Sequence, residues 1–363
     1  MKEAFDRRRM AGSADGRKIQ AVCVVLRDYI RKHYAAGEVL MPVRQLAGAL
    51  GTSLPTVCGA LQQLKLAGFL EVNHGERTRI AAAALSPRVG ILVPADMTHP
   101  EASEYNRIVT HHLLKALREQ GMGVSFYSGF NVPWASNTEE MPWNFLNDAR
   151  CGHLDAVVVN GAHCSPGIAL CEDVNIPVVG MSHEYPAYVT LGLESARLGA
   201  RALLRAGCRR MALIAWENQV SRPAFEREVR AQKGRTVPEW VRTGMDRGAH
   251  PSIPGSGRRL FGEIWDAFDE KPDGLVIADD VYVPEVVQAI GERKIEVPAM
   301  LRVAAHHNKG NRFVYPFPVT LVENDPERQA RELAEVVLVK LGLRPQELPT
   351  QRVLKSTVIK NEE

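Results

Sequence analysis

Five residues able to bind a metal ion lie within a short stretch of the chain: Cys151, His153, His163, Cys164 and Cys171. Thiolates and imidazoles are the ligands that zinc prefers in proteins. Their spacing matches no compact zinc motif, and the six cysteines of the chain contain no CxxC pair. We therefore expect loop and core residues around one strand, with reduced cysteines, and we predict neither a metal site nor a cofactor.

The sequence motifs of common enzyme chemistry are missing. The 363 residues contain no G-x-S-x-G, no H-E-x-x-H and no phosphate-binding P-loop. No nucleophile stands near a base at a recognisable spacing. We therefore predict no catalytic residues and a protein that is not an enzyme.

Basic side chains cluster at a turn near the N-terminal end. The sequence EVNHGERTRI predicts two short strands, 69–72 and 77–80, joined by a tight turn. His74, Arg77 and Arg79 lie at or beside its tip, where they are able to reach phosphates or the minor groove of DNA.

Three helices are expected before this hairpin. Apolar residues recur at steps of three and four from Ile19 to His33, which predicts a helix with one buried face. A second short helix begins near Pro42, and Gly51 suits the left-handed position after its end. Ser53 then caps a third helix. Two short helices joined by a tight turn, with a hairpin behind them, indicate a winged helix-turn-helix.

The charge distribution agrees with a nucleic-acid-binding head. Residues 1–83 hold 13 Lys and Arg against 7 Asp and Glu, whereas the rest holds 32 against 35. A basic head on a mildly acidic body is the pattern of a polyanion-binding domain attached to a domain that does not bind polyanions. We predict a flexible basic arm over 1–17, the winged helix over 18–82 and a linker over 83–87.

The head resembles the winged-helix domain of GntR-type regulators in the stretch MPVRQLAGALGTSLPTVCGALQQLKLAGFLEVNHGERTRIA. Leu54 and Cys58 stand where that family usually has arginines, so two guanine-reading groups are lost. Ser53 and Thr56 have the alternative role of capping and packing the helix. The resemblance implies contacts to double-stranded DNA by Arg44, Ser53, Thr56, Gln62, His74, Arg77 and Thr78.

Behind the linker, strands and helices alternate through residues 88–363. Buried-type strands such as RVGILVP and MALIA are followed by helical segments, which predicts parallel sheets with helices on both faces. This length is too great for one such sheet, so two lobes are expected. The expected division assigns 88–187 with 318–342 to the first lobe, and 188–317 with 343–363 to the second.

The body resembles the two-lobed, periplasmic-binding-protein-like sensor of LacI-type regulators, most specifically in ALLRAGCRRMALI and PDGLVIADD. That resemblance implies a small effector between the lobes, a sugar-like or related polar metabolite, although several of the family's usual polyol-binding acids are missing here. The residues it implies for the effector are Ser182, His183, Arg222, Asp280 and His307. A surface salt bridge or helix cap is the alternative role of Arg222 and Asp280.

These features together predict a cytoplasmic, homodimeric transcription regulator, a repressor by family resemblance, whose operator affinity responds to a ligand. Two heads would read two half-sites of a pseudo-palindrome. No segment is apolar enough for a membrane span. The alternative is a cytosolic solute-binding protein of the same two-lobed fold whose head binds DNA without sequence specificity. An enzyme on this fold is the third class, and it lacks any supporting motif.

Overall fold

The computed structural model describes residues 14–72, 76–98, 103–131, 141–160, 165–216, 219–249 and 253–361. The chain divides into two compact units. One comprises Met1–Ala102, Val109–Val189 and Ala330–Arg352, and the other comprises Ser103–Ile108, Thr190–Gln329 and Val353–Glu363. Within the described ranges, no helix has both the length and the apolar character needed to cross a bilayer.

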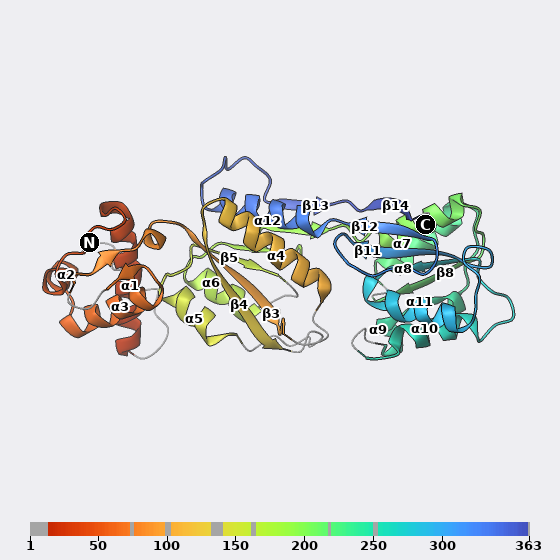
Figure 1. Cartoon of the computed structure of the whole chain (residues 1–363), viewed down its shortest axis with the longest axis horizontal. Helices are drawn as coiled ribbons and strands as arrows, with labels where there is room; N and C mark the ends of the chain where they lie inside the picture. The colour runs from red at the N-terminus through yellow and green to blue at the C-terminus, as the bar shows by residue number, and fades with distance from the viewer. Residues whose placement is uncertain are drawn as a thin grey trace. The chain divides into compact units, whose positions relative to one another are not determined.

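The first unit begins with a three-helix head followed by a two-stranded hairpin (Figure 1). Its elements are α1 (Ala14–His33), α2 (Val43–Leu50), α3 (Leu54–Leu66), β1 (Leu70–Glu71), β2 (Arg79–Ile80) and the 3-10 turn η2 (Ala82–Ala84). The apolar faces of the three helices pack together around Leu26, Leu46 and Leu64, all completely buried. Burial of this amphipathic face, rather than helix propensity, stabilises helices as short as α2.

The local signals in the head act as the sequence predicts. The Ser53 hydroxyl accepts a hydrogen bond from the Thr56 N–H at 3.3 Å, and Gly51 ends α2 in the left-handed region with φ of 62°. The first helix, however, begins at Ala14, inside the segment expected to be a flexible arm. Residues 1–13 lie outside the described part of the chain, as does the expected wing tip with His74.

A six-stranded sheet forms the centre of the first unit's larger part, in the order β13-β7-β6-β5-β3-β4. Its strands are β3 (Arg88–Ala95), β4 (Gly123–Asn131), β5 (Ala156–Val159), β6 (Val178–Gly180), β7 (Tyr188–Leu191) and β13 (Gln351–Leu354). Its helices are α4 (Glu104–Glu119), α5 (Trp143–Arg150), α6 (Ser165–Asp173) and α12 (Pro326–Lys340). Phe145 of α5 and Leu170 of α6 pack against one face of the sheet, and α4 and α12 lie over the other (Figure 1).

The second unit repeats this plan with the strand order β14-β12-β11-β10-β8-β9. Its strands are β8 (Met211–Ala215), β9 (Val241–Thr243), β10 (Gly274–Ile277), β11 (Arg302–Asn308), β12 (Val319–Asn324) and β14 (Thr357–Asn361). Its helical elements are α7 (Ser195–Arg205), α8 (Ser221–Ala231), η3 (Pro238–Trp240), α9 (Gly244–Arg247), α10 (Ser256–Trp265), η4 (Asp280–Tyr282) and α11 (Val283–Glu292). Helices cover both faces of this sheet, α7 and α8 on one face and α10 and α11 on the other. Successive residues of β8 therefore pack alternately against the two pairs of helices.

The expected lobe boundaries are wrong near the C-terminus. We assigned 318–342 to the first lobe, but β12 pairs in parallel with β11 and therefore belongs to the second sheet. The chain returns to the first unit only at Ala330, and β14 then pairs antiparallel with β12. Interstrand hydrogen bonds decide this assignment, and the helix-strand alternation of the sequence does not reveal which strands pair.

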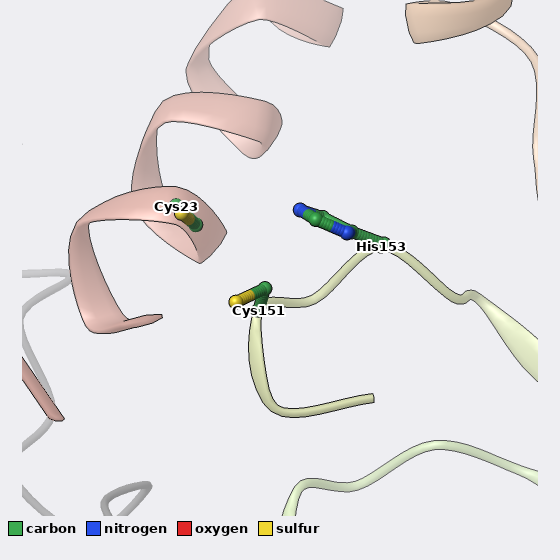
Figure 2. A group of neighbouring side chains, drawn as sticks. All are labelled: Cys23, Cys151 and His153. Atoms are coloured by element: carbon green, nitrogen blue, oxygen red, sulfur yellow. The ribbon is translucent and has the colours of Figure 1, made fainter. Parts of the chain in front are cut away.

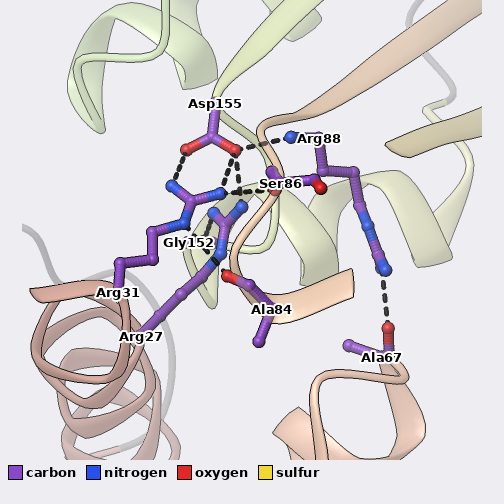
Figure 3. A network of polar contacts seen from close by, with 8 residues as sticks. All are labelled: Arg27, Arg31, Ala67, Ala84, Ser86, Arg88, Gly152 and Asp155. Atoms are coloured by element: carbon purple, nitrogen blue, oxygen red, sulfur yellow. Dashed lines mark hydrogen bonds and ion pairs between the residues drawn. The ribbon is translucent and has the colours of Figure 1, made fainter. Parts of the chain in front are cut away.

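Inside the first unit, a buried ion-pair network fastens α1 of the head to the start of the first sheet (Figure 3). One Asp155 carboxylate accepts from Arg27 Nη2 at 2.5 Å, from Arg31 Nη1 at 2.5 Å and from the backbone N–H of Arg88 at 2.7 Å. The Arg27 side chain is only 4% exposed and that of Asp155 17% exposed. Both oxygens of the carboxylate thus accept hydrogen bonds, and a charged group that is removed from water needs such partners.

The arginines of this network also hold the neighbouring backbone. Arg31 donates to the carbonyl oxygens of Ala84 at 3.2 Å and Ser86 at 2.9 Å, so the expected linker 83–87 is tied to α1. Arg27 and Arg88 lie over the Phe69 ring, at 4.8 and 4.3 Å from its centroid. Cation–π contact therefore adds to the ion pairs.

Removing the charge of Asp155 tests the network. In Asp155→Asn, the buried Arg27 and the half-buried Arg31 lose their counter-charge, and we expect a loss of about 3–5 kcal/mol in the free energy of unfolding. Denaturant unfolding followed by far-UV circular dichroism measures it. The control is Asp266→Asn, whose carboxylate pairs with Arg293 but is 55% exposed, and we expect it to cost less than about 1 kcal/mol. Equal losses in the two variants would contradict this role.

The same ion pairs predict a pH dependence. Burial by itself raises the pKa of Asp155, but the hydrogen bond from Arg31, the charge of Arg27 and the Arg88 N–H outweigh it and leave the pKa below its usual value. Burial lowers the pKa of Arg27 to about 10, so its guanidinium remains charged at neutral pH.

A depressed carboxyl pKa stabilises the fold above the pKa of the unfolded chain, about 3.9 for Asp. The stability difference between wild type and Asp155→Asn should therefore be constant from neutral pH down to about pH 5 and disappear at lower pH. Unfolding curves at a series of pH values measure this difference. A difference that titrates near neutrality would refute the assignment.

Candidate DNA-binding surface and effector site

The outer face of α3 carries side chains that no described element covers. Leu54, Cys58 and Gln62 recur every four residues, so they share one face of the helix, and all three are exposed. Val57, Ala60 and Leu64 are buried on the opposite face. The Ser53 hydroxyl, which caps the helix, lies 2.7 Å from the Thr56 hydroxyl, so both groups remain near its N-terminal end.

The other residues expected to contact DNA lie on α2 and the hairpin. Arg44 on α2 and Arg77 before β2 are exposed. Thr78 is half-buried, and its carbonyl oxygen accepts from the Leu40 N–H at 2.8 Å, so its first role is to close the hairpin onto the head. Arg79 donates to the Gly37 carbonyl oxygen at 2.9 Å. A helix N-terminus suits binding of phosphate, and so do exposed arginines.

A cluster of polar side chains lies at the carboxyl ends of β10 and β11 in the second unit. Asn308 Nδ2 donates to Asp280 Oδ2 at 2.8 Å, and the Asp280 N–H donates to His306 Nδ1 at 3.3 Å. Asn308 is 2% exposed, and its Oδ1 is a buried acceptor without a partner among the described residues. An orphaned buried acceptor is costly unless a ligand or water donates to it. This edge of a parallel sheet is where α/β folds bind ligands.

Neighbouring elements extend the cluster. Asn324, at the end of β12, lies 2.8 Å from His306 Nε2 and accepts from the Ser356 hydroxyl at 2.6 Å. Burial raises the pKa of the Tyr105 and Tyr315 phenols, and the charge of Asp280 raises both further, so they stay neutral at physiological pH. Phenol, amide and carboxylate groups together supply the donors and acceptors that a hydroxyl-rich ligand needs.

The structure brings two of the five expected effector residues into this region. His307 follows His306 on β11, and burial lowers its pKa, so it is neutral at pH 7. Arg222 pairs with Glu226 of its own helix at 2.9 Å, in agreement with the alternative role of a surface salt bridge. Ser182 accepts from the Glu184 N–H at 3.3 Å within a turn of the first unit, and His183 is exposed there.

Sequence reasoning missed several residues of this site. Tyr105, Asn324 and Ser356 join the Asp280 cluster from three segments far apart in the sequence, and no local motif marks them. The available signal was the position of polar residues at the ends of β11 and β12, because the carboxyl ends of parallel strands meet at one edge of a sheet. Reading Asn308 and Asn324 as strand-end residues would have placed both near Asp280.

Two family models match the chain over separate ranges. Residues 19–80 match the bacterial regulatory proteins of the gntR family. Residues 200–361 match the periplasmic binding protein-like domain. No curated protein sequence matches the chain.

Solved structures of regulators share the fold of the body at low identity. The transcriptional regulator CelR in complex with cellobiose is 16% identical with a TM-score of 0.57, covering 89% of this chain and 100% of that one. The trehalose repressor from Escherichia coli is 16% identical with a TM-score of 0.57, covering 76% and 100%. A regulatory protein of the LacI family from Chloroflexus aggregans is 16% identical with a TM-score of 0.60, covering 75% and 97%.

The gntR family and the similar structures named above are regulators. The head has the gntR pattern, and the body has two mostly parallel sheets with the fold of LacI-family structures. The chain therefore combines an N-terminal domain of the gntR regulatory type, matched over residues 19–80, with a body of which residues 200–361 match the periplasmic binding protein-like domain.

Proposed function

We propose that this regulator binds a pseudo-palindromic operator as a homodimer and represses transcription, with operator affinity set by a small polar ligand of the body. The observation that carries the DNA-binding part is the exposed face of α3 at Leu54, Cys58 and Gln62. The second helix of a helix-turn-helix lies in the major groove and presents its N-terminal residues to base edges.

The chemistry of that face predicts the kind of operator. Leu54 is 43% exposed and apolar, and with Cys58 it replaces the guanine-reading arginines of the family. Apolar side chains in the major groove contact the methyl group of thymine. We therefore expect A·T pairs opposite Leu54, and phosphate contacts from Arg44 and Arg77.

Selection from a random duplex pool with the full-length protein tests this proposal. At ~150 mM salt, a physiological ionic strength, we expect a two-fold symmetric motif with A·T pairs in each half-site. Arg44→Ala should weaken binding by about 1–3 kcal/mol if the side chain reads a base, or lower the salt slope by about one if it binds phosphate.

The control is Arg205→Ala, which removes an exposed arginine in the last turn of α7, in the unit that does not contain the head. We expect it to leave the selected motif and the affinity unchanged. Binding that depends on salt but not on sequence would refute specific recognition. It would favour a solute-binding protein whose head binds DNA non-specifically. This alternative is also supported by Leu54 and Cys58, which stand where the family usually has arginines.

For the ligand, the cluster around Asp280 supports a carbohydrate or a similar polyol. The buried Asn308 Oδ1 lacks a donor among the described residues, and a ligand hydroxyl would supply one. Tyr315 adds an aromatic ring beside the polar groups. The solved complex of CelR holds cellobiose, which supports this ligand class by likeness of fold.

Thermal unfolding with a panel of mono- and disaccharides, polyols and nucleosides tests the ligand class. A ligand at one hundred times its Kd stabilises the folded protein by about 2.7 kcal/mol. We expect a sugar-class compound to raise the Tm of wild type and of Asp266→Asn. In Asp280→Asn, the same compound should raise the Tm much less. An equal shift in Asp280→Asn would contradict the proposed site.

The ligand that passes this test should also change operator affinity. Coupling between two sites of one protein is typically about 1–3 kcal/mol. Titration of the selected operator with and without the ligand measures it, and an unchanged affinity would exclude a ligand-responsive regulator.

A further inference from the structure

Three side chains that bind metals in other proteins meet at the junction of the head with the first sheet (Figure 2). Cys23 lies on α1, and Cys151 and His153 follow α5. Their ligand atoms all lie within 4.8 Å of one another, and the three residues are 0%, 1% and 1% exposed. We predicted no metal site from the sequence, because the spacing of Cys151 and His153 with the residues that follow them matches no zinc motif. Cys23 lies more than a hundred residues before them.

The imidazole of His153 is oriented as a metal ligand would be. Asp148 Oδ1 lies 3.0 Å from Nδ1, which fixes the ring, and Figure 2 shows the ring pointing toward the two cysteines. The other nitrogen, Nε2, is buried without a partner among the described residues. A carboxylate on one nitrogen with the second nitrogen free is the arrangement of metal-binding histidines.

The backbone between the two loop residues is shaped for this approach. Gly152 has a φ of 67°, a left-handed conformation that side chains rarely adopt. A Cβ at Gly152 would stand 2.6 Å from Val24 Cγ2 of α1. Glycine therefore lets the loop close onto α1, which brings Cys151 and His153 to Cys23.

We propose that Cys23, Cys151 and His153 form a zinc site that fastens the winged helix to the first sheet. Two thiolates and a neutral imidazole balance the charge of Zn²⁺, so the occupied site is neutral and its burial costs little. Binding releases two thiol protons to solvent. Asn147 Oδ1, 3.8 Å from Cys151 Sγ, stands within reach as a fourth ligand.

The distances require only a small closure. Ligand atoms in a tetrahedral site with ordinary Zn–S and Zn–N bonds stand roughly 3.6–3.8 Å apart. The observed limit of 4.8 Å is about one ångström wider. Because Cys23 Sγ also lies 3.6 Å from the Ala60 carbonyl oxygen of α3, closing the site would restrain the helix that presents Leu54 and Gln62.

Metal content of the full-length protein tests the proposal directly. The protein is reduced until all six thiols titrate, stripped with a chelator, loaded with ZnCl₂ and gel-filtered. We expect one zinc per chain in wild type and in the control Cys208→Ser, a buried cysteine of the second unit. Cys23→Ser, Cys151→Ser and His153→Gln should each lose it.

Two further measurements separate a metal site from a merely structural cluster. Asp148→Asn keeps the ligands and should weaken zinc binding about 10- to 100-fold. Cobalt loading of wild type should give a thiolate-to-cobalt charge-transfer band, with about half its intensity in either cysteine variant that still binds cobalt. Far-UV circular dichroism of each apo variant verifies that it folds.

The alternative product of two neighbouring thiols is a disulfide. If fully reduced wild type keeps no zinc after loading, the proposal is wrong, whether or not oxidation then links Cys23 to Cys151. Zinc retained equally by Cys23→Ser and wild type would also overturn it, because the ion would then be bound elsewhere.

Discussion

The Asp155 carboxylate is the contact on which the position of the DNA-binding head depends. It receives two guanidinium groups from α1 and one backbone N–H from the start of β3. Without these donors a buried carboxylate would be severely destabilising, and without the carboxylate Arg27 would be a buried unpaired cation. The carboxylate and the guanidinium groups therefore stabilise each other only when they are in contact. This contact holds α1 in one orientation on the first sheet.

One face of α1 supplies three side chains of this junction. Cys23, Arg27 and Arg31 are spaced by four residues, so they lie one above another and face residues 151–155 together. The segment 151–155, which faces α1, is short because Gly152 allows a tight turn between the end of α5 and Asp155. Because Arg27 and Arg31 hold α1 to this loop, a displacement of the loop would break these contacts or displace α1 with it.

The second sheet carries its polar cluster at its strand ends for a physical reason. Parallel strands covered on both faces leave only their ends open for polar side chains. In the second unit this edge carries Asp280, His306, Asn308 and Asn324, and the buried amide of Asn308 retains an acceptor without a partner among the described residues. The head, in contrast, presents its chemistry on the exposed side of one helix. The proposed DNA-binding face and the proposed ligand site therefore belong to different units of the chain, and coupling between them would have to pass through packed elements.

The sequence by itself determined the elements of the head and the alternating order of the body. Caps, glycine ends and apolar stripes act within a few residues, so Ser53 and Gly51 could be read directly. Only the tertiary structure decided which distant segments meet. Arg27 and Asp155 are 128 residues apart, β12 joins the second sheet and not the first, and Cys23 faces a loop that no spacing rule connects to it. Such contacts depend on how whole elements pack, and a local pattern carries no information about its partner's position in the chain.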